Sequence, residues 1–146
     1  MTAKKRQMHL AVFWLGTGNH SAGWRMEGAA DSNCSWPIVE VGARIAERGK
    51  FDLFFIADSL ASVPNDHPSF QTRFEPTTTV AASSLVTHHV GLGATVSTSF
   101  SAPFTVARTF QSLQHFSQGR IAWNVVSSSS DNAALNFSMK RHYEHD

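Results

Sequence analysis

Hydrophobic and polar positions along the chain predict four repeats of a strand followed by a helix. The strand candidates are near-continuous apolar runs without strict alternation, which is typical of parallel strands buried on both faces. They occupy residues 8–14, 51–57, 90–96 and 120–126. The fold class is therefore α/β. Repeated βα units either close a barrel or build an open, doubly wound sheet, and periodicity alone does not choose between the two.

Helical spacing of apolar residues predicts the crossover helices between these strands. Two stripes are clear: Ile38, Val41 and Ile45 at i, i+3, i+7, and Val106, Phe110 and Leu113 at i, i+4, i+7. A third helix is expected over about residues 76–87, with Pro76 in its first turn after Glu75. One side of this helix is expected to carry Val80, Ala81, Ser84 and Leu85. Gly49 and Gly119 stand before strands, where a helix ends, and predict left-handed C-terminal caps.

Composition excludes several classes of protein. Twelve basic and eleven acidic residues give a formal charge of +1, so the chain has no basic field for nucleic acid. The only cysteine, Cys34, excludes an internal disulfide and fits a reducing compartment. The apolar run after the basic start of the chain is about seven residues long, too short for a membrane span and poor as a signal peptide. We expect a cytoplasmic protein with no membrane partner.

Polar residues at the carboxyl ends of the predicted strands are the candidates for a site. Asp58 directly follows a strand, where a carboxylate accepts hydrogen bonds from a ligand or, alternatively, serves as a helix N-cap or turn aspartate. Thr95 offers a hydroxyl, although threonine is also an ordinary strand residue. Asn124 lies inside an apolar strand and needs a hydrogen-bond partner, in a site or in a structural network. The serine run at residues 127–130 fits a flexible linker or part of a site.

Four ordered segments, ERGKFD, FFIADS, GLGATVST and QGRIAWNVV, together carry a family resemblance. The chain resembles the bacterial luciferase-like flavin monooxygenases, in particular the branch of nitrilotriacetate monooxygenase component A and dibenzothiophene sulfone monooxygenase. The resemblance implies a TIM (β/α)8 barrel that uses reduced FMN and O2 to oxygenate a small organic substrate. It also implies an NAD(P)H-dependent flavin reductase as the partner that supplies reduced FMN. We further expect a homo-oligomer.

The resemblance also implies which residues bind the cofactor. Asp58 and Thr95 match flavin-contacting positions of the family, with the neighbouring Ser97 as the alternative to Thr95 if the register is off. Asn124 is a further expected contact. His145 aligns with the histidine of a family motif, while a metal pair with His142 and a solvated polar tail are its alternatives. No metal site is expected, and the resemblance assigns no catalytic residue.

Members of that branch are several hundred residues long, so this chain is similar to their N-terminal portion only. A complete barrel needs about 250 residues. We therefore expect a single incomplete domain over residues 1–146, truncated after the fourth strand and about four βα units long, with weak or no activity of its own. The alternatives are a non-catalytic remnant or half-barrel that acts only by association, and a barrel enzyme that uses a deazaflavin.

Overall fold

The computed structural model describes residues 7–20, 22–30, 32–62 and 71–144 and has an α/β fold. Its four strands form one parallel sheet in the order in which they occur along the chain. They are β1 (Ala11–Trp14), β2 (Leu53–Ile56), β3 (Gly91–Ser97) and β4 (Ile121–Val126). All four predicted strands are confirmed. Residues 8–10 lie outside β1, and β3 continues one residue further than expected, to Ser97.

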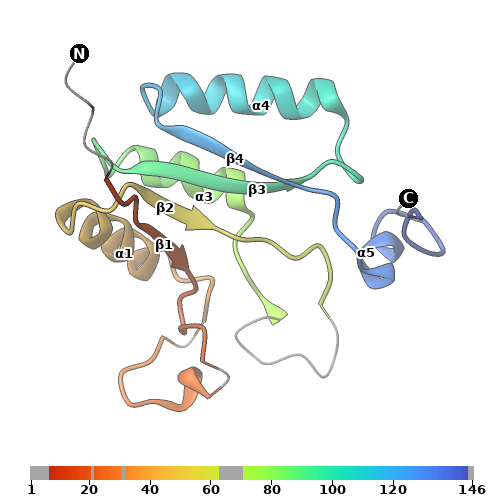
Figure 1. Cartoon of the computed structure of the whole chain (residues 1–146). Coiled ribbons are helices and arrows are strands. Elements are labelled where there is room, and N and C mark those ends of the chain that lie inside the picture. Colours follow the sequence, from red (N-terminus) through yellow and green to blue (C-terminus); the bar gives the residue numbers. More distant parts are fainter. Residues whose placement is uncertain (1–6, 21, 31, 63–70, 145–146) are drawn as a thin grey trace.

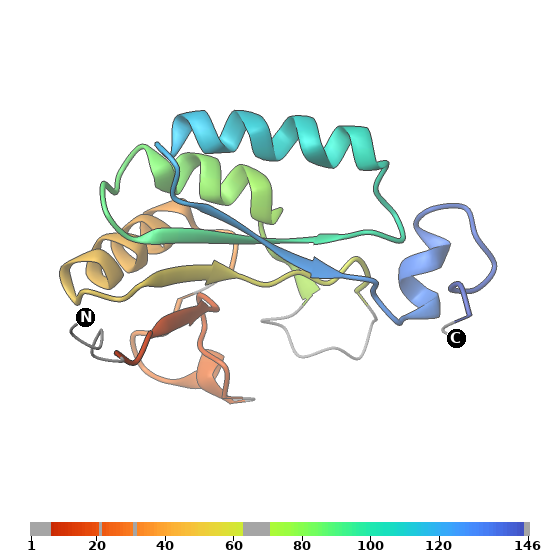
Figure 2. The same cartoon turned by 45° about the horizontal axis from the view of Figure 1, so that its top comes forward.

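The three long helices described lie on one face of this sheet (Figure 1, Figure 2). They are α1 (Trp36–Arg48), α3 (Pro76–Ser84) and α4 (Pro103–Phe116). Two shorter elements, η1 (Gly23–Arg25) and α5 (Asp131–Leu135), lie beyond the carboxyl ends of the strands. A doubly wound sheet has helices on both faces and reverses its strand order, whereas a barrel keeps consecutive strands adjacent and its helices outside. The structure therefore resolves the choice in favour of a partial (β/α)8 barrel.

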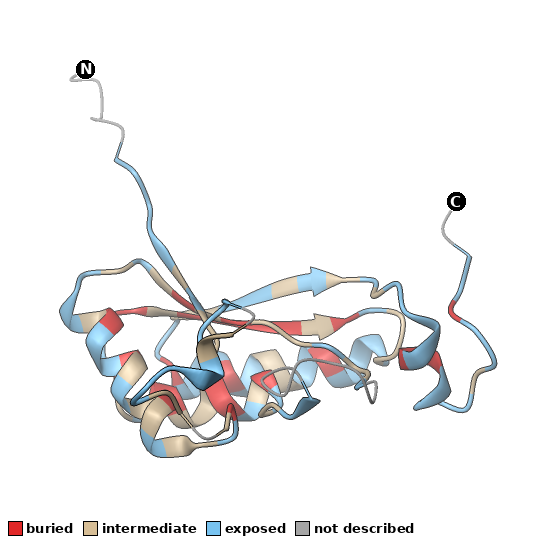
Figure 3. Ribbon diagram, turned by 90° about the horizontal axis from the view of Figure 1, so that it is seen from below, coloured by how far each residue is buried: buried red, intermediate tan, exposed pale blue. Residues whose placement is uncertain are grey.

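The hydrophobic core lies between the sheet and the helices, where Figure 3 shows the buried residues gathered. Phe54 and Leu92 point toward the helices and are fully buried. Because side chains alternate along a strand, their neighbours Phe55 and Gly93 belong to the opposite face, which no described helix covers. None of the described helices is long and apolar enough to cross a membrane.

The predicted apolar stripe of α1 is wrong. The side that faces the sheet carries Val39, Ala43 and Ala46, whereas Val41 and Ile45 are 55% and 50% exposed. The physical reason is close approach: small residues let α1 lie directly on the strands. On the same helix, Gly42 leaves room for the indole of Trp14, since a Cβ there would stand 2.2 Å from that ring. The larger aliphatic side chains instead occupy the flank and outer side of α1.

The stripe of α4 is confirmed, and that of α3 only in part. Val106 and Leu113 of α4 are buried, and the ring of Phe110 lies 5.5 Å from that of Trp123 on β4. The predicted start of α3 is also confirmed, because Glu75 accepts hydrogen bonds from the second and third residues after it. Leu85 is wrong as a core residue: it is 76% exposed, since α3 ends at Ser84 and the next position turns outward.

One of the two predicted glycine caps is confirmed and the other is wrong. Gly119 has a φ of +86° and ends the turn after α4, as expected. Gly49 has a φ of −74°, and Lys50 takes the left-handed conformation instead, with a φ of +61°. The chain leaves α1 one residue later than predicted, because the amide of Phe51 still donates to the carbonyl of Ala46.

Replacing Lys50 with glycine is expected to stabilise the chain by about 0.5–1 kcal/mol. The left-handed conformation strains a residue that has a Cβ, and glycine relieves more strain than its extra backbone entropy costs. Urea unfolding of Lys50→Gly measures the gain. Lys50→Ala is the matched control, since it removes the ammonium but keeps the Cβ. An equal gain in both variants would assign the effect to charge rather than to the backbone.

Two charged side chains join the elements at the amino end of the sheet. One carboxylate oxygen of Glu47, near the end of α1, accepts backbone N–H bonds from His88, His89 and Val90 at 2.7, 2.6 and 3.1 Å. Burial opposes the charged form of this carboxyl, but the N–H donors outweigh it, and its pKa is lowered to about 2. Glu47 therefore fastens α1 to the turn between α3 and β3.

Arg120 fastens β4 to the same turn. Its guanidinium donates to the carbonyls of Ser84, Thr87 and Val90 at 3.2, 3.0 and 2.8 Å and to the hydroxyl of Thr87 at 3.1 Å. Carbonyls after a helix lack intrahelical donors, so a cation there supplies both hydrogen bonds and favourable charge. Burial lowers the pKa of Arg120, and the negative charge of Glu47 opposes that shift.

Candidate functional site

A hollow of about 840 Å³, open to solvent, lies at the carboxyl ends of β2, β3 and β4. Barrel active sites occupy this end of the strands. The hollow brings together Asp58, Thr95 and Asn124, three of the four residues predicted from the sequence. His145 lies outside the described residues. The remaining lining residues are Phe13, Phe55, Ala57, Ser59, Leu60, Val126, Ser128, Ser129, Ser130 and Ala133.

Aromatic side chains form one wall of the hollow. Phe13 of β1 and Phe55 of β2 are paired in register, and their ring centroids lie 5.5 Å apart. Because side chains alternate along a strand and Phe54 faces the helices, both belong to the opposite face of the sheet. An apolar wall beside polar groups is typical of sites for flat organic ligands.

Asp58 supplies the acidic group. Its Oδ1 accepts the N–H of Ser59 at 2.8 Å, so part of the turn-aspartate interpretation holds. Burial raises the pKa of this carboxyl, while the Ser59 N–H and the charge of Arg73 oppose the shift and Glu75 adds to it. No hydrogen bond to Oδ2 is found among the described residues. That oxygen is therefore available to a donor in the hollow.

Thr95 and Asn124 form a hydrogen-bonded chain across three strands. The hydroxyl of Thr95 on β3 lies 3.0 Å from the carbonyl oxygen of Ile56 on β2. The side-chain amide of Asn124 on β4 donates to the same hydroxyl at 3.0 Å. The in-register pairing of these two residues places their side chains together. Asn124 thus takes part in a structural hydrogen-bond network and also lines the hollow.

The serine run after β4 is an ordered part of the rim. Ser128, with a φ of +63°, donates its hydroxyl proton to the hydroxyl of Ser97 at 2.9 Å. The hydroxyl of Ser99 donates to the carbonyl of Ser127. These bonds tie the run to the end of β3, and three of its four serines line the hollow. For the role of this run, its position after a strand was therefore a better predictor than its low complexity.

His142 contacts this rim, because its ring Nε2 lies 3.0 Å from the carbonyl oxygen of Ser127, and sequence reasoning did not place it there. It is 7% exposed, and its backbone N–H donates to Asp131 at the start of α5 at 2.7 Å. Its ring meets Phe100 edge-on, and Phe100 in turn stacks on Phe137 at 4.4 Å. These contacts join residues far apart in sequence, and no motif signals them. Among the described residues, no three His, Cys, Asp or Glu side chains are grouped to hold a metal ion.

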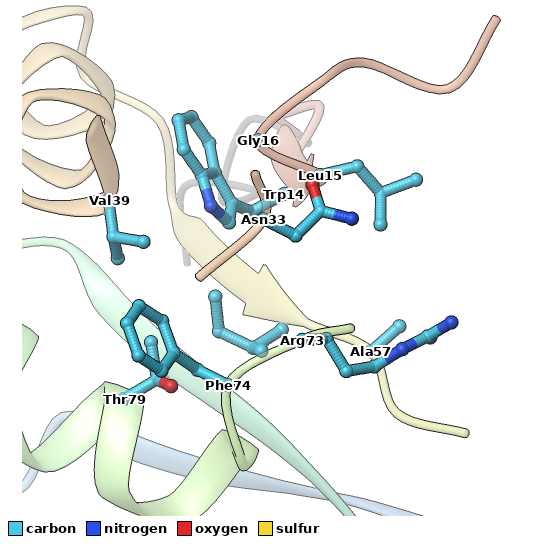
Figure 4. Close-up of a pocket in the computed structure, with 10 residues that line it drawn as sticks. Trp14, Leu15, Gly16, Asn33, Val39, Ala57, Arg73, Phe74 and Thr79 are labelled. Atoms are coloured by element: carbon cyan, nitrogen blue, oxygen red, sulfur yellow. The ribbon is translucent and has the colours of Figure 1, made fainter. Parts of the chain in front are cut away.

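A second, smaller cavity lies on the helix side of the sheet, between β1, β2, α1 and α3. It is lined mainly by apolar side chains, and Figure 4 shows Trp14, Val39, Phe74 and Thr79 around it with Arg73 at one end. Its empty volume is about 340 Å³. Because it lies behind the strands rather than at their helix-free face, it is separate from the polar chain of Thr95 and Asn124.

Comparison with known proteins gives one consistent group of relatives. Residues 20–146 match the family model described as luciferase-like monooxygenase. The chain is 49% identical to N-acetyl-S-(2-succino)cysteine monooxygenase of Bacillus subtilis, over 99% of this chain and 33% of that protein. It is 37% identical to nitrilotriacetate monooxygenase component A of Aminobacter aminovorans, over 96% of this chain and 34% of that protein. The chain spans about a third of the length of these curated relatives.

Solved structures agree with this grouping. EDTA monooxygenase from Chelativorans sp. BNC1 is similar with a TM-score of 0.84 at 31% identity, over 97% of this chain and 34% of that one. Riboflavin lyase, solved with modified FMN and riboflavin, is similar with a TM-score of 0.78 at 27% identity, over 93% of this chain and 33% of that one.

Proposed function

The chain belongs to the luciferase-like monooxygenase family, and from this premise we propose that it carries part of the flavin site of a two-component monooxygenase. In this proposal, reduced FMN and O2 oxygenate a small organic substrate, and a separate NAD(P)H-dependent flavin reductase supplies the reduced FMN. The observation that carries the proposal is the meeting of Asp58, Thr95 and Asn124 in one hollow at the carboxyl ends of three strands. The location is cytoplasmic in this proposal.

The residues of the hollow fit a flavin ring system. Phe13 and Phe55 offer an apolar wall, and Asp58 and Asn124 offer hydrogen-bonding groups beside it. When bound, the flavin would supply the redox chemistry with dioxygen. The tasks left to these side chains are to bind the ring, to orient it and to limit the access of water. The hollow of this chain is open to solvent, and we expect weak or no oxygenation by the chain alone.

The proposal is tested by anaerobic titration of the chain with reduced FMN, followed by size-exclusion chromatography of the same sample. Saturable binding by a monodisperse species is the expected result. Asp58→Asn keeps the size of the side chain but removes an ionised acceptor, and it should weaken binding about 5- to 30-fold, since a hydrogen bond to a charged group contributes about 1–2 kcal/mol. Ser112→Ala, on the outer side of α4, is the control and should bind like the wild type. Absence of saturable binding by the wild type would overturn the proposal.

Riboflavin should bind this chain within about threefold of FMN. No Lys, Arg or His is among the described residues that line the hollow, and the carboxylate of Asp58 repels an anion. An FMN phosphate without a cationic partner contributes little affinity. Parallel anaerobic titrations with the two reduced flavins measure the ratio. A preference for FMN of more than about tenfold would reveal a phosphate site outside the described lining.

The second candidate function is a part that acts only by association, with another copy or another chain. It is favoured by exposed apolar side chains near both edges of the sheet, namely Phe13, Val41, Ile45, Trp123 and Val125. Among the described residues, the strands β1 and β4 also each pair with a strand on one side only. A homo-oligomer that binds no flavin in the test above would favour this candidate over the first.

A further inference from the structure

The cavity on the helix side of the sheet has a buried and largely apolar inner wall. Val39 of α1, Ile56 of β2 and Thr79 of α3 line it, and all three are at most 5% exposed. Trp14 and Phe74 add aromatic rings on two further sides (Figure 4). The space therefore lies among side chains of two strands and two helices, rather than on the surface of the molecule.

Among the described residues that line this cavity, few offer polar groups that could hold water in it. The hydroxyl of Thr79 donates to the carbonyl of Glu75 at 2.7 Å. Oδ1 of Asn33 accepts the N–H of Thr17 at 3.1 Å. Figure 4 shows the guanidinium of Arg73 at the outer end, directed away from the interior of the cavity. A buried water needs about two to four polar partners, whereas a cavity with apolar walls stays dry and binds apolar guests such as xenon.

This cavity adjoins the hollow at the carboxyl ends of the strands. Ala57, directly after β2, lines both spaces. The cavity has an empty volume of about 340 Å³ against about 840 Å³ for the hollow, so it suits a smaller guest than the ring system proposed for the hollow. Among the reactants of the proposed function, dioxygen is the one that is both small and apolar.

We propose that this cavity binds dioxygen and holds it beside the flavin site. A diatomic apolar gas needs no hydrogen bond, and it leaves water for an apolar cavity as other apolar groups do. The identity of the guest rests on the proposed function, because that function consumes dioxygen. The affinity of the cavity for an apolar gas rests on its lining alone.

NMR spectra of the methyl-labelled chain without flavin test the inference. Dissolved dioxygen is paramagnetic and speeds the relaxation of nuclei close to it. The methyl groups of Val39 and Ile56 line the cavity, and those of Val90 and Leu113, also buried in the core but outside the cavity, are the reference. Dioxygen should speed relaxation at least about twofold more in the cavity than at the reference, because an apolar gas concentrates in an apolar cavity.

A matched pair of substitutions tests whether the cavity itself causes this effect. Val39→Ile adds one methyl group at the cavity wall and should lower the effect of dioxygen at Ile56 toward the reference, because the guest loses room. Val41→Ile makes the same chemical change on the exposed side of α1 and should leave the effect unchanged. Circular dichroism shows whether each variant is folded.

Xenon provides a second measurement that needs no variant. Added under pressure to the wild type, it should shift the methyl signals of Val39 and Ile56 in a saturable manner and leave those of Val90 and Leu113 in place. Xenon shifts without any dioxygen effect would overturn the assignment of dioxygen as the guest.

Two further results would overturn the inference. One is equal relaxation by dioxygen at the cavity and reference methyl groups. The other is a nuclear Overhauser contact between water and the methyl groups of Ile56, which would show that the cavity is hydrated. Because these samples contain no flavin, either result leaves the FMN titration untouched. A chain that binds no FMN would instead overturn the proposed function, with the measured binding of gas unchanged.

Discussion

Arg120→Ala is expected to lower the free energy of unfolding by about 3 kcal/mol. The guanidinium satisfies three carbonyls and one hydroxyl in the turn between α3 and β3. Hydrogen bonds from a charged donor contribute about 1.5–3 kcal/mol each. A half-buried acceptor left without a donor costs more free energy than an exposed acceptor, because water reaches it less easily. Water can replace some of these bonds, which keeps the sum well below a simple addition of four.

Urea unfolding followed by circular dichroism measures this effect. Arg120→Lys should fall between the wild type and the alanine variant, because an ammonium cannot reach four acceptors with the geometry of a planar guanidinium. Arg108→Ala is the control: Arg108 is exposed on α4, and its loss should change stability by less than about 0.5 kcal/mol. Equal, small effects at both positions would show that the bonds of Arg120 are replaced by water without cost.

Glu47→Gln should be destabilising at neutral pH and nearly neutral in acid. The folded pKa of Glu47 is about 2, against 4.5 for the ordinary carboxyl. Because the folded value is the lower one, the carboxylate's contribution is fully present above about pH 4.5 and is lost as the pH falls toward 2. The carboxyl lies close to solvent, so screening reduces its contribution to about 1–2 kcal/mol.

Unfolding curves of the wild type and Glu47→Gln at pH 7, 4 and 3 test this expectation. The gap between the two proteins should be widest at pH 7 and should narrow stepwise as the pH falls. Glu40→Gln removes a carboxylate from the same helix, and within the described part of the chain this carboxylate forms an ion pair only with Arg44, one turn away, at 2.9 Å. Its effect should stay below about 0.5 kcal/mol. A gap for Glu47→Gln that does not change with pH would mean that shape, and not charge, joins α1 to the turn.

Much of the fold was predictable because its signals are local. Apolar runs located β1 to β4, and Glu75 with Pro76 located the start of α3. The choice between barrel and doubly wound sheet was not local, since it depends on which face each helix covers. Likewise, the stripe of α1 misled because the sheet selects small residues for close contact and leaves Val41 and Ile45 outside.

The residues of the candidate site that lie at strand ends were predictable from the sequence. The contacts between residues that are remote in sequence were not. Asp58, Thr95 and Asn124 each follow from a polar residue at or near the carboxyl end of a strand, and parallel strands bring such ends together. Glu47 and His142 bind backbone groups and rings that are remote in sequence. The spacing of residues along the chain does not predict such contacts.

The hydroxyl-rich rim and the two charged fastenings lie at opposite ends of the same strands. Changes to the serine run at residues 127–130 therefore leave Glu47 and Arg120 untouched, and a library randomised there should yield mostly folded variants. In evolutionary terms, one end of the sheet is free to explore ligands while the other preserves the architecture. For protein engineering, residues of the rim are the ones to randomise, and the residues at the amino end of the sheet are the ones to keep unchanged.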